Sequence, residues 1–235
     1  TGKMVAALRK LGFEKVFDTD LGADITIVEE ASEFIKRLNS GENLPMITTC
    51  CPAWIKFGEQ FFYDELTHMS TCRSPQAILA SLIKTYYAEK VGIDPKKIVL
   101  VDIMPCTAKK FEILRPEFLG DADYVLTTVE LGKLIKEMNI DFEHLEPQQF
   151  DNPLGESTGA GAIFGHTGGV MEAALRTVAD WLEHKNFKHI DYTTIRGMET
   201  LKEATVHVDG REVNIAVVHT LGEARKLMDQ IRAGT

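Results

Sequence analysis

Two cysteine-containing segments are the parts of this 235-residue sequence best suited to chemistry: MITTCCPAWIK at 46–56 and VDIMPCTAKK at 101–110. In each, a strand-like apolar stretch precedes cysteine beside proline, and a lysine-bearing helix start follows. Helix amino termini favour thiolates, and thiolates are the form of cysteine that binds metals. Cys50, Cys51 and Cys106 therefore offer soft ligands of the kind that iron–sulfur chemistry uses.

A second interpretation of these segments is two buried structural cysteines beside helix starts, and the residues alone leave both interpretations open. The spacing of the four cysteines matches neither a pair of zinc-binding CxxC motifs nor a small disulfide-rich domain. Adjacent cysteines rarely pair with each other, so we expect reduced or metal-bound thiols. For Cys72 we predict the role of a small buried hydrophobic residue.

The elements that position these segments alternate between strand and helix, which predicts an α/β fold with parallel pairing. Helices are predicted at 3–11, 29–39, 52–62, 74–90 and 131–138, and strands at 15–18, 46–49, 98–103 and 124–128. Ligands of open parallel sheets gather at the carboxyl ends of the strands, where both cysteine segments begin.

Two lobes are expected, a first α/β lobe at 1–140 and a second at 162–235, joined by a linker at 141–161. The second lobe is predicted to contain helices at 170–185 and 223–232 and strands at 203–208 and 212–219 around the Asp209–Gly210 turn. We expect each lobe to have a small, mostly parallel sheet flanked by helices, with the active site in the cleft between lobes. Because only hairpin strands serve the second lobe, we expect it to be incomplete and the chain to be a fragment.

The composition excludes some classes of function. A net charge of −9 argues against binding to nucleic acid or to anionic membranes. No apolar run reaches the roughly 18 residues that a membrane-spanning helix needs. The chain begins with Thr1 and shows no signal-peptide pattern, so we expect a processed chain or a piece of a longer protein. We expect the cytoplasm as its compartment, with the periplasm as the alternative.

Three motifs together resemble the catalytic domain of iron-only (FeFe) hydrogenases: TCCPAW at 49–54, MPCTAKKFE at 104–112 and FGHTGGVMEAALRT at 164–177. The likeness runs over essentially the whole chain, and the first two motifs carry cluster ligands in that family. The resemblance implies an H-cluster, which is a 4Fe–4S cluster joined to a diiron subcluster. It also implies the reversible reaction of two protons and two electrons to dihydrogen.

The resemblance further implies roles for single residues. Cys51 and Cys106 would ligate the 4Fe–4S cluster, while Cys50 would pass protons to the diiron site. Lys109 would donate to a cyanide on the distal iron. The other residues that the resemblance places around the diiron subcluster are Met104, Pro75, Gln76 and Phe164.

A proton path is also implied by the resemblance, through Glu30, Ser70, Glu33 and Arg37. Glu30, Glu33 and Arg37 are spaced at i, i+3 and i+7, so they fall along one stripe of their predicted helix. Glu33 and Arg37 could instead form an ordinary solvated ion pair. Beside the TCCPAW motif we favour the proton path.

The sequence departs from the family pattern in three ways. Thr49 replaces the usual serine and keeps the hydroxyl, and His166 stands where a small residue is usual. No cysteine follows Cys106, whereas the family takes its last two cluster ligands from a Cys-x-x-x-Cys motif after the final helix. The family's amino-terminal ferredoxin-like cluster sequences are missing as well. We therefore expect these 235 residues alone to be metal-free and inactive.

The resemblance implies two kinds of partner: a ferredoxin or accessory iron–sulfur domain or subunit as electron partner, and hydrogenase maturation factors. Exposed strand edges would also allow self-association. One alternative is a hydrogenase-like sensor or an iron–sulfur assembly relative without hydrogen turnover, but the retention of Cys50 and Lys109 favours catalytic ancestry. Another is a small-molecule-binding α/β domain using the glycine-rich 159–169 stretch, which lacks both GxGxxG and a P-loop lysine.

Overall fold

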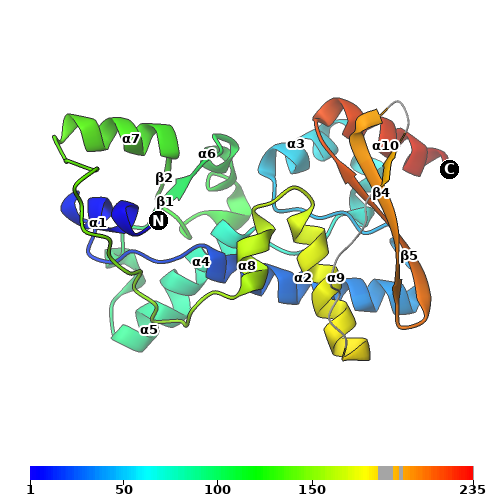
Figure 1. Cartoon of the computed structure of the whole chain (residues 1–235), viewed down its shortest axis with the longest axis horizontal. Helices are drawn as coiled ribbons and strands as arrows, with labels where there is room; N and C mark the ends of the chain where they lie inside the picture. Colours follow the sequence, from blue (N-terminus) through cyan, green and yellow to red (C-terminus); the bar gives the residue numbers. More distant parts are fainter. Residues whose placement is uncertain (185–192, 196–197, 235) are drawn as a thin grey trace. The chain divides into compact units, whose positions relative to one another are not determined.

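The computed structural model describes residues 1–184, 193–195 and 198–234 (Figure 1). In this described part the fold is mixed α/β, with one two-stranded and one three-stranded sheet among many helices. None of the described helices is both long and apolar enough to cross a membrane.

Two compact units are each assembled from two separate stretches of chain. Unit 1 comprises Thr1–Asp24 and Ser74–Thr158, and unit 2 comprises Ile25–Arg73 and Gly159–Thr235. The chain leaves unit 1 and enters unit 2 within helix α2 (Asp20–Ser40). This division differs from the lobes expected at 1–140 and 162–235, because sequence periodicity reports neighbours along the chain whereas compactness depends on long-range contacts.

Unit 1 holds a small parallel sheet in which β1 pairs with β2, Val101 opposite Tyr124 and Met104 opposite Thr127. Its elements are α1 (Gly2–Lys10), α4 (Pro75–Leu82), the π-helical η2 (Ile83–Tyr87), α5 (Ala88–Val91), η3 (Pro95–Lys97), β1 (Val101–Met104), α6 (Ala108–Glu112), η4 (Pro116–Phe118), β2 (Tyr124–Thr127) and α7 (Thr128–Glu137). The helices predicted at 3–11, 74–90 and 131–138 and the strands predicted at 98–103 and 124–128 are therefore confirmed, with shifted ends. The strand predicted at 15–18 is wrong: those residues are irregular, and four residues of mixed polarity cannot specify a strand without a partner.

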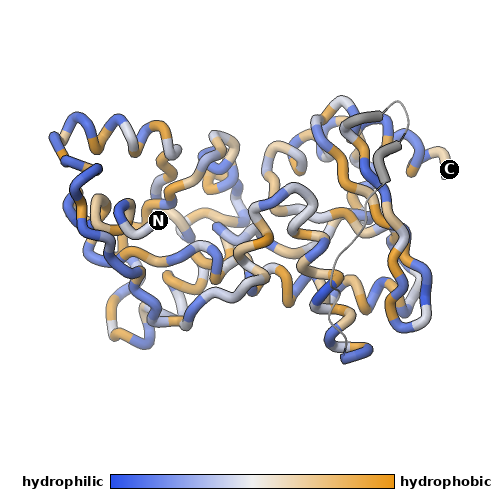
Figure 2. Tube along the Cα trace, viewed as in Figure 1, coloured by the Kyte–Doolittle hydropathy of each residue, from blue (hydrophilic) through white to orange (hydrophobic). Residues whose placement is uncertain are grey.

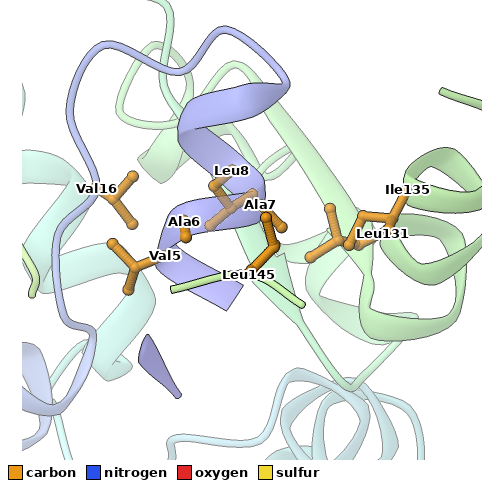
Figure 3. Packing of buried hydrophobic residues seen from close by; sticks show 8 residues of the cluster. All are labelled: Val5, Ala6, Ala7, Leu8, Val16, Leu131, Ile135 and Leu145. Atoms are coloured by element: carbon orange, nitrogen blue, oxygen red, sulfur yellow. The ribbon is translucent and has the colours of Figure 1, made fainter. Parts of the chain in front are cut away.

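The main core of unit 1 lies between α1 and α7. Val5 and Leu8 of α1 and Leu131 and Ile135 of α7 are all buried. Figure 3 shows Leu145 projecting into the space between these two helices. A capping box fixes the start of α7, because the Thr127 hydroxyl accepts from the Glu130 backbone N–H while the Glu130 carboxylate accepts from Thr127. The apolar stripes thus hold the helices against β1, whose Ile103 packs on the same cluster.

Unit 2 holds an antiparallel sheet of order β3-β4-β5, so the mostly parallel sheet expected for this part of the chain is wrong. Its elements are the later part of α2, α3 (Pro52–Phe61), η1 (Tyr63–His68), α8 (Gly159–Phe164), α9 (Gly169–Glu183), β3 (Thr193–Ile195), β4 (Met198–Val208), β5 (Arg211–Val218) and α10 (Leu221–Ala233). The predicted hairpin is confirmed: Val208 faces Arg211, and Asp209 and Gly210 adopt φ of 51° and 69°, as a two-residue hairpin turn requires. The strand predicted at 46–49 is wrong, because Ile47 forms only an isolated bridge with Met69.

Helices are predicted well in unit 2. Those expected at 52–62, 170–185 and 223–232 are present as α3, α9 and α10, although Lys185 lies outside the described residues. The helix expected at 29–39 begins earlier, at Asp20.

One face of the unit 2 hairpin forms the core of that unit. Hydrophobic and hydrophilic residues intermingle along β4 and β5 (Figure 2). The apolar ones, Val206, Val208, Val213 and Ile215, are buried. They pack with Ala31 of α2 and with Leu175 and Val178 of α9. This packing holds the Glu30–Arg37 part of α2 in place.

Candidate functional site

The vicinal cysteines occupy the start of helix α3. Cys51 is the exposed N-cap residue, Pro52 is the first helical residue, and the Cys51 carbonyl accepts from the Ile55 N–H at 3.1 Å. Cys50, just before it, is half-buried. All four cysteines belong to the described part of the chain, and none is in a disulfide.

Cys72 lies near this loop within unit 2. The Thr49 hydroxyl donates to the Cys72 carbonyl at 3.0 Å, so this hydroxyl joins the two cysteine-bearing segments of unit 2. The Cys72 side chain is half-buried, with Sγ 3.9 Å from the Thr26 carbonyl. Burial, reinforced by the negative charges of Glu30 and nearby acidic groups, raises the pKa of the Cys72 thiol to about 12. The thiol therefore stays protonated and inert at neutral pH, as a small hydrophobic residue would.

Glu33 is the centre of a hydrogen-bonded group. Its Oε2 accepts from the Ser70 hydroxyl at 2.8 Å, and the Thr71 N–H donates to the same carboxylate at 3.0 Å. The Arg37 guanidinium donates to Oε1 at 2.7 Å. Burial alone would raise the pKa of Glu33, but the bonds from Ser70, Arg37 and Thr71 outweigh it and lower that pKa. Glu33 is thus a held carboxylate rather than a solvated surface group.

Arg37 is buried and anchored to the backbone. Its guanidinium donates to four carbonyl groups at 2.7–3.1 Å, those of Asn43, Thr67, His68 and Met69. These bonds and the ion pair with Glu33 give the N–H donors of the planar Arg37 guanidinium hydrogen-bond acceptors. The alternative of an ordinary solvated Glu33–Arg37 pair does not describe this arrangement, since Arg37 is only 8% exposed.

Glu30 differs sharply from Glu33, one helical turn away. Its side chain is 1% exposed, and within the described residues neither carboxyl oxygen has a partner of good hydrogen-bond geometry. Burial raises the pKa of Glu30 to about 7, and the proximity of the Thr49 backbone and the Ser70 hydroxyl offsets only part of this rise. Glu30 can therefore gain and lose a proton near neutral pH. The structure brings together Glu30, Glu33, Ser70 and Arg37, all within unit 2.

The second cysteine segment lies in unit 1. Cys106 is half-buried in the short connection between β1 and α6, and Met104 at the end of β1 is buried. Lys109 and Glu112 on α6 are both buried and form an ion pair at 2.9 Å. Their i, i+3 spacing places them on one side of this short helix.

Gln76 lies at the start of α4 in the same unit. Ser74 caps this helix by accepting from the Ala77 N–H at 3.3 Å, and Pro75 is its first residue. A side chain at Gly22 would put its Cβ 2.4 Å from the Pro75 carbonyl oxygen, so glycine allows the close approach. Gln76 is 2% exposed, yet neither polar atom of its amide has a partner among the described residues.

A small hollow of about 10 Å³ lies beside Gln76 and Glu112 and is otherwise lined largely by apolar side chains, including Ala77 and Phe118. An unsatisfied buried amide is costly unless another polar group completes it. Taken singly, the soft thiol donors Cys51 and Cys106 and the unpartnered Gln76 amide are of the chemical types that an iron–sulfur cluster with polar ligands binds. The described residues contain no preformed group of three or more His, Cys, Asp or Glu side chains suited to a metal ion.

Phe164 and His166 lie at the α8–α9 connection of unit 2. Phe164 is the half-buried last residue of α8, and His166 is exposed. A Cβ at Gly169 would lie 1.8 Å from the Ile163 carbonyl oxygen, so only glycine permits this tight connection. Phe164 does not belong to the hydrogen-bonded group around Glu33.

Sequence reasoning missed Asp102 and Glu112. Asp102 lies on β1, and its Oδ2 is buried without a hydrogen-bond partner among the described residues. Burial raises the pKa of Asp102 to about 7; Lys109 lowers it and Glu112 raises it further. The sequence did show a carboxylate inside an apolar strand. Burying such a carboxylate costs free energy unless a charged neighbour compensates it.

Comparisons with known proteins place these residues in a wider context. The whole chain, residues 1–235, matches the family described as "Iron only hydrogenase large subunit, C-terminal domain". It is 51% identical to the NADP-reducing hydrogenase subunit HndD of Solidesulfovibrio fructosivorans, over 100% of this chain and 42% of that protein. It is 47% identical to the periplasmic [Fe] hydrogenase large subunit of Nitratidesulfovibrio vulgaris, over 100% of this chain and 57% of that protein. Its structure resembles an apo [FeFe]-hydrogenase HydA1 variant from Chlamydomonas reinhardtii with a TM-score of 0.88 and 39% identity, covering 99% of this chain and 67% of that one. The chain thus spans about half the length of these curated relatives.

Proposed function

The chain belongs to the C-terminal domain family of iron-only hydrogenase large subunits, and on this premise we propose that it forms part of an active site that interconverts protons and electrons with dihydrogen. The observation that carries the proposal is the group around Glu33. A buried carboxyl group with a pKa of about 7, Glu30, is influenced by the same Ser70 hydroxyl that donates to the Glu33 carboxylate. Such a group suits proton transfer better than it suits a structural role.

Cys51 and Cys106 are proposed as thiolate ligands of the 4Fe–4S part of an H-cluster. Lys109 and Gln76 are proposed to donate to the polar ligands of the diiron part, while Met104, Pro75 and Phe164 line its surroundings. The buried, unpartnered Gln76 amide supports this assignment. When bound, the cluster supplies the iron at which protons and electrons combine.

The chain's own residues are proposed to deliver the protons. Glu33 receives a proton from solvent, and the Ser70 hydroxyl relays it to the Glu30 carboxyl group, which can hold it near pH 7. The Cys50 thiol then carries the proton onward. Arg37 takes no part in the transfer, and its bonds to four carbonyls keep Glu33 facing Ser70.

The 235 residues alone are proposed to be inactive, since only two of their cysteines match family ligands and two ligands hold a four-iron cluster poorly. In the longer protein, we propose a ferredoxin or an accessory iron–sulfur domain or subunit as electron partner. Maturation factors are proposed to supply the diiron unit, and the cytoplasm is proposed as the compartment.

Iron and acid-labile sulfide, measured after anaerobic reconstitution of the longest natural protein containing this chain, test the metal assignment. Cys51→Ala and Cys106→Ala should each lower the iron content. Cys72→Ala is the matched control, because Cys72 is a half-buried cysteine of unit 2 with no proposed metal role, and it should retain iron. Equal iron in all three variants would overturn the assignment.

Hydrogen evolution by the matured protein tests the proton route. We expect Glu30→Gln to lower turnover about 100-fold or more, the usual range for loss of a proton-transfer group. Glu29→Gln alters the exposed neighbour on the same helix and should not change turnover. A protein that binds the cluster but neither forms nor consumes hydrogen would instead favour the sensor or assembly alternative.

A further inference from the structure

Strand β1 presents two different faces. Ile103 packs against the α1–α7 core of unit 1, so the residues on either side of it point to the opposite face. Asp102 and Met104 therefore share one face of β1. Across the parallel pairing, Asp102 lies opposite Val125, which is apolar and buried, so β2 offers it no charged partner there.

Helix α6 supplies the charges that act on Asp102. Within the described residues, Lys109 lowers the pKa of its carboxyl group and Glu112 raises it, because the two side chains carry opposite charges. Both are buried, and they pair with each other at 2.9 Å. The α7 residues packed near Ile103, Leu131 and Ile135, are apolar and lie on the other face. Asp102, Lys109 and Glu112 thus form a buried cluster of two carboxyl groups and one ammonium.

The cluster is unbalanced because one ammonium cannot neutralise two ionised carboxylates. Glu112 holds the direct ion pair with Lys109, whereas Asp102 Oδ2 has no hydrogen-bond partner within the described residues. A buried carboxyl group in that position is stabilised by keeping its proton. Two negative charges would otherwise share one positive charge in a poorly solvated region.

We propose that Asp102 is a second carboxyl partner of Lys109, a positioning residue that holds a proton and thereby sets the net charge around that lysine. With Asp102 protonated, the cluster is neutral; loss of the proton leaves it at −1. This inference rests on the proposed function in one respect: Lys109 is the group proposed to face a cyanide ligand, so the charge of the cluster would reach the cofactor through Lys109.

Titration of the aspartate carboxyl carbons by NMR tests the proton-holding role on the metal-free chain. In protein labelled with ¹³Cγ-aspartate, one signal should titrate near pH 7 and be missing from Asp102→Asn. Glu112→Gln should lower that midpoint by about half a pH unit or more, and Lys109→Met should raise it by a similar amount. Asp94→Asn, which changes an exposed aspartate of the same unit, should leave the signal unmoved.

Shifts of the titration midpoint in opposite directions in Glu112→Gln and Lys109→Met are expected of a charge cluster. An aspartate with only a structural role would not show them. If Lys109→Met does not fold, the displacement in Glu112→Gln still decides. A midpoint near 4, or a midpoint near 7 that neither variant moves, would overturn the inference.

The titration of the metal-free chain does not depend on the iron–sulfur cluster. It can therefore fail while the iron measurements succeed, and the iron measurements can fail while the titration succeeds. In the matured protein, the infrared cyanide bands should change with pH around neutrality, and Asp102→Asn should abolish this change. Bands that respond to pH identically in both proteins would overturn the link from Asp102 to the cofactor.

Discussion

The group around Glu33 in unit 2 and the Asp102 cluster in unit 1 contain the same parts in different arrangements. Each has a cation, an acidic residue bonded to that cation, and a second buried carboxyl group whose pKa is raised to about 7. In unit 2 the Ser70 hydroxyl lies between the two carboxyl groups. In unit 1 the Oδ2 of Asp102 has no hydrogen-bond partner among the described residues, and the charges of Lys109 and Glu112 act on its pKa.

The cations differ as well. Arg37 donates to four backbone carbonyls, whereas Lys109 donates to the Glu112 carboxylate. Arginine keeps its charge at all relevant pH values and fixes geometry through its planar fork, while lysine is a compact and flexible point charge. The difference teaches that similar residue sets, arranged differently, suit the proton transfer proposed for unit 2 and the control of local charge proposed for unit 1.

Removing the anchored cation should have the largest effect. Arg37→Ala removes the buried donor that binds four carbonyls and the Glu33 carboxylate. We therefore expect a loss of about 3–5 kcal/mol in the free energy of unfolding. Urea denaturation at pH 7 measures this loss, with Lys36→Ala as the exposed control on the same helix. A loss below about 1 kcal/mol, the range of exposed pairs, would mean that the anchoring is unimportant.

Glu30→Gln should reveal the pH dependence expected of a carboxyl group with a raised pKa. The stability that Glu30 contributes is present below its ordinary pKa of 4.5 and is lost as the pH rises through about 7. Between pH 4.5 and pH 7, the free energy of unfolding of the variant should therefore rise by about 3 kcal/mol relative to that of the unchanged protein. Above pH 7 this difference should stay constant. Urea unfolding at a series of pH values measures this difference, and a flat difference would show that Glu30 is ionised like a surface group.

Glu33→Gln should change the pH dependence of stability in the opposite direction. The pKa of Glu33 is lowered, so its contribution is present above pH 4.5 and is lost as the pH falls through the folded-state value. We expect the variant to be about 1–2 kcal/mol less stable at pH 7, with the deficit shrinking in acid. The same pH series of unfolding curves measures it. If the deficit grew in acid, the contrast between the two glutamates would be lost.

The smallest expected effect is a difference in alkylation rate between two cysteines, Cys51 and Cys72. Cys51 is exposed at a helix start, while the half-buried Cys72 thiol has its pKa raised to about 12. Iodoacetamide at pH 8 should modify Cys72 at least about tenfold more slowly than Cys51. Peptide mass spectrometry over time gives both rates in one sample, and similar rates would argue that Cys72 is no inert thiol.

The sequence by itself determined the family and much of the local structure. The TCCPAW and MPCTAKK segments identified the family, helical spacing put Glu30, Glu33 and Arg37 on one stripe, and Asp209–Gly210 marked the hairpin. These features depend on residues close together in the chain, where covalent geometry and periodicity limit the possibilities.

Only the tertiary structure decided which of these groups lie in contact and how strongly each is buried. Ser70 meets Glu33 across 37 positions of sequence, and Arg37 reaches the Met69 carbonyl across 32. The raised pKa of Asp102, the antiparallel sheet of unit 2 and the discontinuous units likewise depend on contacts between distant segments. The physical reason is that burial and electrostatic environment belong to the folded surroundings of a residue, which its sequence neighbours do not specify.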